Sequence, residues 1–213
     1  MKSARLHKIV SYVRKDDRVL DIGADHAYVP ILLREQNLTT VADVAEITRG
    51  PLESARKNII ASGFRNQINL FLSDGVLSVD INKYDTFVIA GMGGISINTI
   101  LRQKKIKQNL ILHPTNAIPK VRKTLCKLRY EIKDEVVVEE NGVFNVILFA
   151  EYSGKRRYMS AKKAYLGPLM SINKSEETKK YFERSLNSLK TVNAKTNGKK
   201  FGKEIKWIES IWK

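Results

Sequence analysis

The sequence predicts an α/β fold in which a mostly parallel sheet ends in an antiparallel hairpin and a smaller helical region follows. Three observations support this prediction. Short apolar runs alternate with amphipathic segments through residue 125, as in βαβ units. Two further apolar runs flank Asn141-Gly142, a dipeptide typical of a two-residue hairpin turn. From Ser153 onward the chain is polar, lysine-rich and helical in its spacing.

The alternation through residue 125 predicts five strands and the helices between them. We expect strands near residues 18–22, 39–43, 68–72, 85–90 and 109–112, and helices near 3–15, 28–36, 50–62, 94–103 and 116–127. The hairpin should add strands near 131–139 and 143–151. This order is similar to that of the class I methyltransferase fold, a Rossmann-like, seven-stranded sheet with one antiparallel strand. A fold by itself does not establish a function.

The C-terminal region carries two apolar stripes at helical spacing. One stripe is Phe182, Leu186 and Leu189, and the other is Phe201, Ile205, Ile208 and Trp212. They predict two antiparallel helices packed through a coiled-coil-like seam. A further helix near 160–172 contains a Leu-Gly-Pro sequence, which should kink or break it. We therefore predict two domains, residues 1–152 and residues 153–213.

The charge of the chain is large and uneven. The 213 residues carry a net charge of +16, and residues 155–213 hold 16 basic against 5 acidic side chains. Such an excess attracts polyanions and releases their counterions on binding. A lysine-rich composition throughout the chain would be a simpler explanation, but it does not account for the asymmetry. We therefore expect a nucleic acid partner.

Other features of the composition narrow the class of protein. No apolar run approaches the ~20 residues that a membrane helix needs, and the basic N-terminus does not resemble a signal peptide. Cys126 is the single cysteine, so no intrachain disulfide or cysteine-cluster metal site can form. We expect a cytoplasmic protein without a bound metal. We also expect a monomer, because the two apolar stripes can cover each other within one chain.

The first candidate site lies in VLDIGADHAYVP, residues 19–30, where a strand ends in Asp-x-Gly. Gly23 permits a tight turn and close approach of a ligand. A dinucleotide would favour glycines that face its pyrophosphate, whereas this turn carries Asp21, Asp25 and His26. Carboxylates suit the cationic sulfonium and ammonium groups of S-adenosylmethionine, so we interpret the turn as a site for that cofactor. Asp25 could also cap the helix expected at 28–36.

Acidic residues also close the second and third predicted strands. Asp43 ends the run TTVAD and can accept hydrogen bonds from both ribose hydroxyls of a nucleoside. Glu46 is the rival candidate, and we prefer Asp43 because it directly follows the alternating residues. Asp74 and Gly75 close the third strand, where Asp74 can accept a hydrogen bond from adenine N6 or simply form a turn. These strand ends meet at the ligand-binding edge of an open α/β sheet, so the acids predict one joint site.

Two further segments follow the fourth and fifth predicted strands. AGMGG, residues 90–94, permits close backbone approach to methyl donor and acceptor alike. It lacks the [DN]-PP-[YF] sequence with which many amino-methylating enzymes of this fold bind an exocyclic amine, which leaves ring nitrogens as acceptors. HPTN, residues 113–116, forms a rigid turn in which Asn116 either contacts the target base or, like Thr115, caps a helix. Met92 packs against a base or against the core.

Together DIGADHAYVP, GPLESARKN, SDGV, AGMGG and HPTN, in this order and at this spacing, closely resemble the bacterial tRNA (adenine-22-N1)-methyltransferase family. The resemblance covers residues 3 to about 170. It implies a class I S-adenosylmethionine enzyme with a C-terminal coiled-coil domain that acts on the D-loop region of tRNA. It implies cofactor contacts from Asp21, Gly23, His26, Asp43, Asp74, Gly75 and Gly91. Toward the target base it places Asp25, His26, Met92, Gly93, Gly94, Pro114 and Asn116. The stretch after Asp43, VAEITRGP, is longer than usual, which leaves Asp43 or Glu46 open as the ribose ligand.

These assignments give a hypothesis for the chemistry. Adenine N1 lies on the Watson–Crick edge, so the target base must be unpaired or extruded. Because N1 of neutral adenine carries no proton and the product is cationic, transfer needs in-line placement and nearby negative charge rather than a general base. We predict catalytic roles for Asp25, Asn116 and Met92. Basic side chains should hold tRNA phosphates, namely Arg102, Lys104, Lys105, Lys107, Lys162 and Lys163. The alternatives are a small-molecule methyltransferase and a non-catalytic RNA-binding protein.

Overall fold

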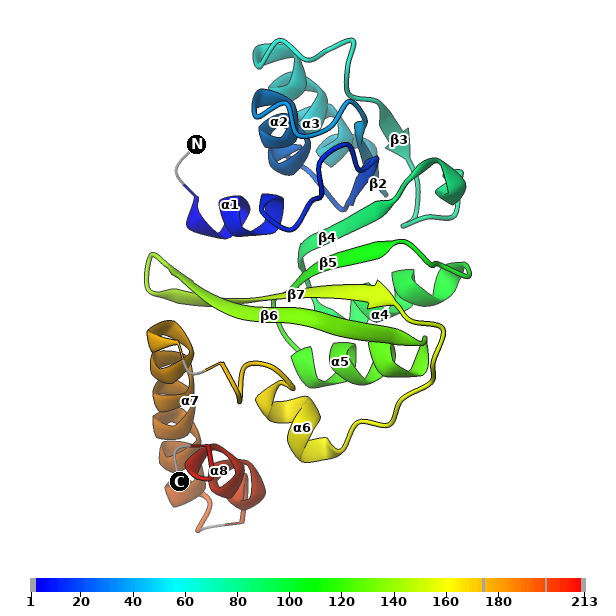
Figure 1. Cartoon of the computed structure of the whole chain (residues 1–213). Coiled ribbons are helices and arrows are strands. Elements are labelled where there is room, and N and C mark those ends of the chain that lie inside the picture. The colour runs from blue at the N-terminus through cyan, green and yellow to red at the C-terminus, as the bar shows by residue number, and fades with distance from the viewer. Residues whose placement is uncertain (1–2, 174, 198, 212–213) are drawn as a thin grey trace.

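A computed structural model of the chain describes residues 3–173, 175–197 and 199–211 (Figure 1). Trp212, the last member of the second predicted stripe, lies outside these ranges. The strands are β1 (Val19–Ile22), β2 (Ala42–Glu46), β3 (Leu70–Leu72), β4 (Thr86–Met92), β5 (Asn109–Pro114), β6 (Tyr130–Glu140) and β7 (Val143–Tyr152). They form one seven-stranded sheet in the order β3-β2-β1-β4-β5-β7-β6. The first five are parallel, and β7 runs antiparallel to both of its neighbours, which confirms the predicted fold class.

Helices cover both faces of the sheet (Figure 1). They are α1 (Ala4–Val10), α2 (Tyr28–Glu35), α3 (Arg49–Ala61), α4 (Gly94–Gln103), α5 (Ile118–Lys127), α6 (Ala161–Leu166), α7 (Glu176–Lys195) and α8 (Gly202–Glu209), with a 3₁₀ turn η1 (Ile81–Lys83). The apolar side chains of α1, α2 and α3 pack on one face. Those of α4 and α5 pack on the other. Both faces of the parallel strands are therefore buried, as parallel sheets require.

The predicted position of the second strand is wrong by three residues. The run at 39–43 was expected to be the strand, but β2 begins at Ala42 and ends at Glu46, and all five of its side chains are buried. Asp43 therefore pairs with Leu20 in the middle of the strand, and Glu46 occupies the carboxyl end. Alternation of apolar and polar residues failed here because a strand covered on both faces need not alternate.

The order of the strands fixes where a ligand can bind. From β1 the chain builds outward through β2 and β3, and it then returns to place β4 on the opposite side of β1. The helices that follow β1 and β4 thus leave toward opposite faces of the sheet (Figure 1). A crevice opens at such a reversal, beyond the carboxyl ends of the strands.

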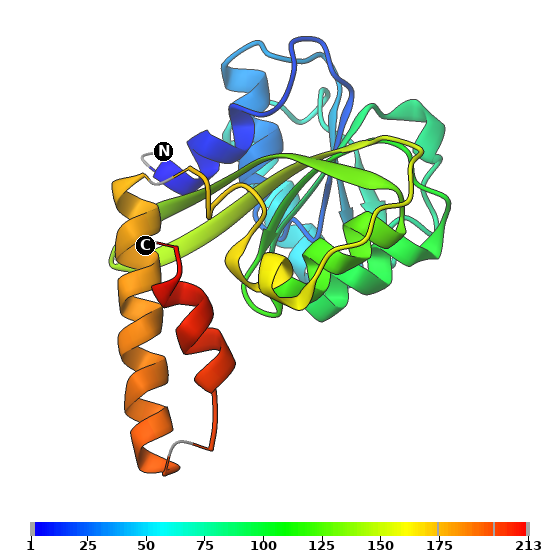
Figure 2. The same cartoon turned by 60° about the horizontal axis from the view of Figure 1, so that its bottom comes forward.

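The C-terminal helices pack on the hairpin as well as on each other. Helix α6 ends at Gly167, whose φ of 85° is favourable for glycine, so the predicted break is observed. Helices α7 and α8 lie side by side and antiparallel (Figure 2), with an ion pair of 2.8 Å between Lys190 and Glu209. Phe182 and Ile208 are buried in one apolar cluster with the hairpin residue Val146. The seam is therefore shared with the sheet.

A buried ion pair joins α5, the hairpin and α6. Arg122 of α5 and Glu135 of β6 pair with side chains that are 2% and 0% exposed. The Arg122 guanidinium also donates to the carbonyl oxygens of Ala164 and Tyr165 at 2.8 and 3.1 Å. Glu135 accepts from the backbone N–H of Met170 at 3.3 Å. These bonds satisfy both charges and hold the start of the C-terminal region against the sheet.

Candidate functional site

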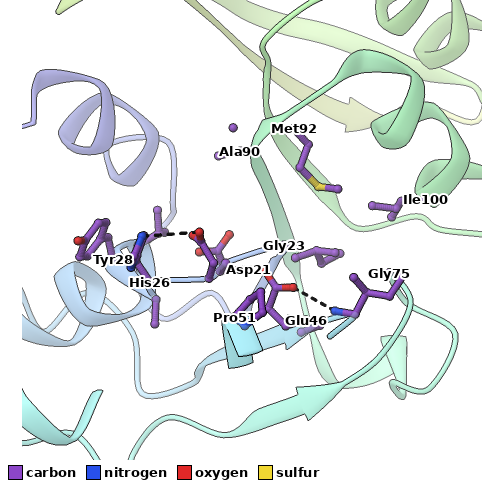
Figure 3. Close-up of a pocket in the computed structure, with 18 of the residues that line it drawn as sticks. Asp21, Gly23, His26, Tyr28, Glu46, Pro51, Gly75, Ala90, Met92 and Ile100 are labelled. Carbon is purple, nitrogen blue, oxygen red and sulfur yellow. Dashed lines mark hydrogen bonds and ion pairs between the residues drawn. The ribbon is translucent and has the colours of Figure 1, made fainter. Parts of the chain in front are cut away.

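The carboxyl ends of β1, β2, β3 and β4 surround a cavity of about 430 Å³ (Figure 3). Its lining includes Asp21, Gly23 and Asp25 from the turn after β1, Glu46 from β2, and Asp74. A cavity of this size falls within the ~300–1,000 Å³ typical of small-molecule sites. The predicted joint site at the strand ends therefore exists, with Glu46 in the place expected for Asp43.

The electrostatics of this cavity are dominated by carboxylates. Asp21 is buried, and its burial, together with the charges of Glu46 and Asp25, raises its pKa to about 8. Burial also raises the pKa of Glu46, with Asp25 adding to the effect. Asp25 itself is 60% exposed at the mouth. The raised pKa values of Asp21 and Glu46 make the cavity a site for a cationic ligand, because a positive charge would stabilise the ionised forms of both carboxyls.

Asp43 lies outside the cavity and is already fully hydrogen-bonded. Its Oδ1 accepts from the backbone N–H and the side-chain amide of Asn69 at 2.9 and 3.0 Å. Its Oδ2 accepts from the Tyr84 hydroxyl at 2.8 Å. Asp43 thus ties β2 to neighbouring segments. Of the two candidate acids, Glu46 lines the cavity and Asp43 does not.

One carboxylate oxygen of Glu46 is available to a ligand. Its Oε2 accepts from the backbone N–H of Ile47 at 3.0 Å, a bond drawn in Figure 3. Its Oε1 has no hydrogen-bond partner among the described residues. A carboxylate oxygen that lines a cavity and has no protein partner can accept a hydrogen bond from a hydroxyl donor of a ligand.

Asp25 and His26 form the mouth of the cavity. Asp25 was expected to cap α2, but the N-cap is Ala27, with a φ of 54° and no side-chain bond. The Asp25 carboxylate instead lies 3.6 Å from His26 Nε2. The His26 ring stacks on Tyr28 with centroids 5.0 Å apart. The left-handed turn at Ala27 therefore leaves the acid and the stacked rings available at the rim (Figure 3).

Asp74 and Gly75 lie at the side of the cavity formed by the end of β3. Asp74 Oδ1 accepts from Gln103 Nε2 at 3.2 Å, and Gln103 Oε1 accepts from the backbone N–H of Val76 at 2.9 Å. Gly75 has a φ of 56°, and a Cβ there would lie 2.3 Å from Gln103 Oε1. The glycine is therefore required by both its conformation and its neighbour.

Residues at the end of β5 and just after it form hydrogen bonds with the AGMGG segment. Gly91 lines the cavity, and its backbone N–H donates to His113 Nδ1 at 3.1 Å. The Thr115 N–H donates to the Met92 carbonyl at 2.9 Å. The Gly94 N–H donates to Asn116 Oδ1 at 3.1 Å. AGMGG and HPTN thus form one unit, which their separation in the sequence did not reveal.

This arrangement changes the roles predicted for Asn116 and Pro114. Neither lines the acidic cavity. Asn116 fixes the first turn of α4 through Gly94, and Pro114 pairs with Met92 in the sheet. The helix after HPTN has Ala117 as its N-cap without a side-chain bond, so Thr115 and Asn116 do not cap it. Gly93, by contrast, lies against the Asn116 side chain, since a Cβ there would be 3.5 Å from it.

His113 acts as a neutral acceptor beneath the glycines. Burial, with a contribution from Arg5, lowers its pKa to about 4. Because Nδ1 accepts from Gly91, the proton of the neutral ring must lie on Nε2. The bond holds Gly91 at a φ of 79°, beside a register shift between Ala90 and Met92 in the pairing of β4 with β5.

The predicted basic cluster lies away from the cavity. Arg102, Lys104 and Lys105 end α4 and precede the amino end of β5, whereas the cavity opens at the carboxyl ends. Lys104 Nζ donates to the Val79 carbonyl at 2.9 Å, and Arg102 donates to Asn98 and Thr124. Lys107 lies 5.8 Å from the centre of the Tyr152 ring. Lys162 and Lys163 are exposed on α6.

Several lining residues carried no recognisable signal in the sequence. Arg5 reaches the cavity from α1, Ile47 from the turn after β2, and Pro51 from the first turn of α3. Tyr28 could have been found as the second ring of the DHAY quartet. Within the described part of the chain, no group of three or more His, Cys, Asp or Glu residues could hold a metal ion. No helix there is long and apolar enough to cross a membrane.

A doubly wound sheet whose strand-switch cavity is lined by carboxylates, without the phosphate-binding glycine fingerprint, defines a class I S-adenosylmethionine-type methyltransferase. A sequence model of the family described as tRNA (adenine(22)-N(1))-methyltransferase matches residues 19–211. The chain belongs to this family.

Relatives and solved structures agree with this assignment. The Bacillus subtilis (strain 168) protein named tRNA (adenine(22)-N(1))-methyltransferase is 36% identical over 153 residues, which is 70% of this chain and 64% of that protein. The match thus spans less than two thirds of that relative. The crystal structure of Bacillus subtilis M1A22 tRNA methyltransferase TrmK superposes with a TM-score of 0.88 at 28% identity, over 99% of this chain and 98% of that one. Streptococcus pneumoniae Sp1610 in complex with S-adenosyl-L-methionine gives a TM-score of 0.91 at 30% identity, over 99% of each chain.

The contact between Gly94 and the end of β5 gives a testable prediction. A Cβ at Gly94 would lie 2.5 Å from the Asn116 backbone oxygen and 2.9 Å from Val121 Cγ2. We expect Gly94→Ala to lower the free energy of unfolding by about 1–3 kcal/mol, because the backbone must move. Gly50→Ala is a matched control near the start of α3, with no atom within 4 Å of its Cβ. It should leave stability unchanged or raise it by up to about 1 kcal/mol. Equal effects in urea unfolding would contradict the prediction.

Proposed function

We propose that this protein transfers a methyl group from S-adenosylmethionine to N1 of the adenine at position 22 of tRNA, as its family name states. The observation that carries the proposal is the group of carboxylates at the strand switch. Asp21, Asp25 and Glu46 face one cavity in a chain that belongs to this family. The net charge of +16 supports a polyanionic substrate.

The residues of the cavity fit the cofactor. When bound, S-adenosylmethionine supplies an electrophilic methyl group on a cationic sulfur. Asp21 and Asp25 provide negative charge near the turn after β1, where a sulfonium or ammonium group would be stabilised. Glu46, with its free Oε1, is the residue we assign to the ribose hydroxyls, and Asp74 is assigned to the adenine amine. Gly23 leaves room beside Met92, because a Cβ there would lie 2.8 Å from the Met92 sulfur.

The chain has the features that transfer to a ring nitrogen requires. Gly91 and Met92 line the cavity on the side of β4, where they can hold donor and acceptor in line. The Asp25 carboxylate lies at the mouth, where it can stabilise the positive charge that develops on the methylated adenine. Adenine N1 releases no proton during transfer, so none of these residues must act as a base. Asn116 contributes by fixing α4 and the glycines rather than by touching the base.

The tRNA would be held by basic residues outside the cavity. Lys162 and Lys163 are exposed on α6, and the region that follows carries much of the net charge. We assign the cluster at 102–107 to a secondary role, because none of its basic side chains lines the cavity. A tRNA substrate also agrees with the expected cytoplasmic location.

The direct test is to incubate the protein with labelled S-adenosylmethionine and unmodified tRNA, and to map the labelled nucleoside by mass spectrometry. We expect 1-methyladenosine at position 22. Label at another atom or position would refute the assigned acceptor. Cofactor binding without any label in tRNA would instead favour a small-molecule substrate.

The roles of Glu46 and Asp43 can be separated by matched amide substitutions. We expect Glu46→Gln to weaken S-adenosylmethionine binding by about 10- to 100-fold, since a hydrogen bond to a charged acceptor is lost. Asp43→Asn should leave the dissociation constant essentially unchanged and lower the free energy of unfolding by about 1–3 kcal/mol, because its bonds to Tyr84 and Asn69 are structural. Calorimetric titration and urea unfolding of both variants provide the measurement. A larger loss of affinity in Asp43→Asn would restore Asp43 as the ribose ligand.

The raised pKa of Asp21 predicts a pH dependence of cofactor binding. Below about pH 8 the buried carboxyl holds a proton, and a cationic ligand favours the ionised form. Binding should therefore release this proton, and affinity should rise with pH by at most about tenfold per unit before levelling above the free-enzyme pKa. Calorimetry in buffers of different ionisation enthalpy measures the released proton.

The amino group of the ligand also titrates in this range, so Asp21→Asn is the control. This variant should keep the ligand's own pH dependence and lose the additional proton release. Identical proton release in both proteins would show that Asp21 does not titrate on binding.

A further inference from the structure

A second concave surface lies between the hairpin and the C-terminal helices. One hollow, of about 440 Å³, is lined by Phe144, Tyr165, Tyr181 and Arg184, among others. An adjoining hollow of about 200 Å³ shares Tyr165 and Tyr181 and reaches Asn116. We call the two together the aromatic groove. No step of the methyl transfer described above uses it.

The aromatic groove opens on the same edge of the sheet as the acidic cavity. Strand β7 runs antiparallel to β5, with Leu148 opposite Leu112. The hairpin turn before Val143 therefore projects beyond the carboxyl end of β5 (Figure 1). Asn116 connects the two sites, since it lines the groove and its side chain bonds to Gly94 of AGMGG.

Half-buried rings and one cation form the wall of the groove. Phe144 and Tyr181 meet edge to face with centroids 6.1 Å apart. The Arg184 guanidinium lies 5.8 Å from the centre of the Phe144 ring and donates to the Gly142 carbonyl at 2.6 Å. This bond and the ring fix the direction of Arg184, while its remaining N–H groups stay available to a ligand.

The tyrosine hydroxyls of the groove also lack partners. Neither Tyr165 nor Tyr181 donates a side-chain hydrogen bond to another described residue. Burial raises the pKa of Tyr165 to about 12 and also raises that of Tyr181, so both remain protonated donors at neutral pH. Neither hydroxyl is among the buried polar atoms without a partner, so both are open to solvent and can donate to a ligand.

Unpaired nucleotides match this surface better than other ligands do. Bases stack on aromatic rings and on arginine without regard to sequence, and a nearby guanidinium binds phosphate. The basic C-terminal region would draw a polyanion toward the groove. Extruding the target adenine breaks stacking with its neighbours at a cost of a few kcal/mol. A second stacking surface near the catalytic edge would offset that cost.

We propose that the aromatic groove binds an unpaired nucleotide of the tRNA next to the target adenine, with its base against Phe144 and Tyr181 and its phosphate on Arg184. This inference rests on the proposed tRNA methyltransferase activity. It adds a second base-binding site to the one in the acidic cavity. The groove thereby holds the RNA in its opened form while the methyl group is transferred.

The test uses the full chain and unmodified tRNA transcript. We expect Phe144→Leu combined with Arg184→Gln to raise both the dissociation constant and the KM for tRNA by about tenfold, because one stacked base contributes that much or more. The dissociation constant for S-adenosylmethionine and the thermal unfolding midpoint should not change. Phe144→Tyr, which keeps the ring, should bind tRNA as the unsubstituted protein does. Lys179→Gln is the control for charge, because Lys179 is exposed on α7 outside the groove.

A second measurement does not depend on substitution. A photoreactive base is placed on either side of the target adenine, and crosslinked peptides are identified by mass spectrometry. We expect adducts within 143–144, at Tyr165 or within 181–188. Unchanged affinity of the double variant for tRNA, or crosslinks confined to other segments, would overturn the proposed role of the groove. The proposed methyltransferase activity would still stand. Failure of the unsubstituted protein to methylate tRNA would overturn both. If the groove binds a peptide rather than RNA, the double variant should bind tRNA as the unsubstituted protein does, and the proposal would be overturned.

Discussion

The site depends on the crowding of carboxylates at the strand switch. Asp21 and Glu46 are buried at the ends of adjacent parallel strands, and Asp25 adds a third acid at the mouth. Their mutual repulsion and burial keep the pKa of Asp21 near 8. Most folds avoid such an arrangement because it is costly without a counter-charge. It becomes favourable when a cation binds, so a cationic ligand completes the electrostatics of this site.

The second constraint is the rigidity of the opposite wall. The glycines that approach the cofactor have no side chains with which to hold themselves in place. Their position is set by His113, Thr115 and Asn116, which bond to Gly91, Met92 and Gly94 from the end of the neighbouring strand. A neutral imidazole suits this task, because its Nδ1 must accept rather than donate. Asn116, which the sequence predicted to contact the substrate, bonds to the backbone of AGMGG in the structure and so positions that segment.

Much of the fold and the general place of the site could be predicted from the sequence, because strand–helix alternation, the Asn-Gly turn and the order of the motifs are local signals. The errors concern long-range contacts. Asp43 and Glu46 are both buried acids on one strand. The bonds that Asp43 accepts from Asn69 and Tyr84, 26 and 41 residues away, distinguish it from the acid that faces the cavity. The buried Arg122–Glu135 ion pair corresponds to no periodic pattern in the sequence, so it could not be predicted.

The position of the C-terminal helices follows from the same contacts. A basic region on a flexible connection could attract RNA, but it could not direct one base into a cavity. Here Arg122 and Glu135 tie α6 to the sheet, and Phe182 and Ile208 bury α7 and α8 against the hairpin. Arg184 is consequently fixed beside Phe144 at the end of the hairpin that projects over the catalytic edge. The basic charge supplies affinity for any polyanion, while in the proposed mechanism the fixed rings and the acidic cavity each bind an unpaired base. Selectivity for RNA that is opened at the target thus requires the two surfaces to be held on one rigid body.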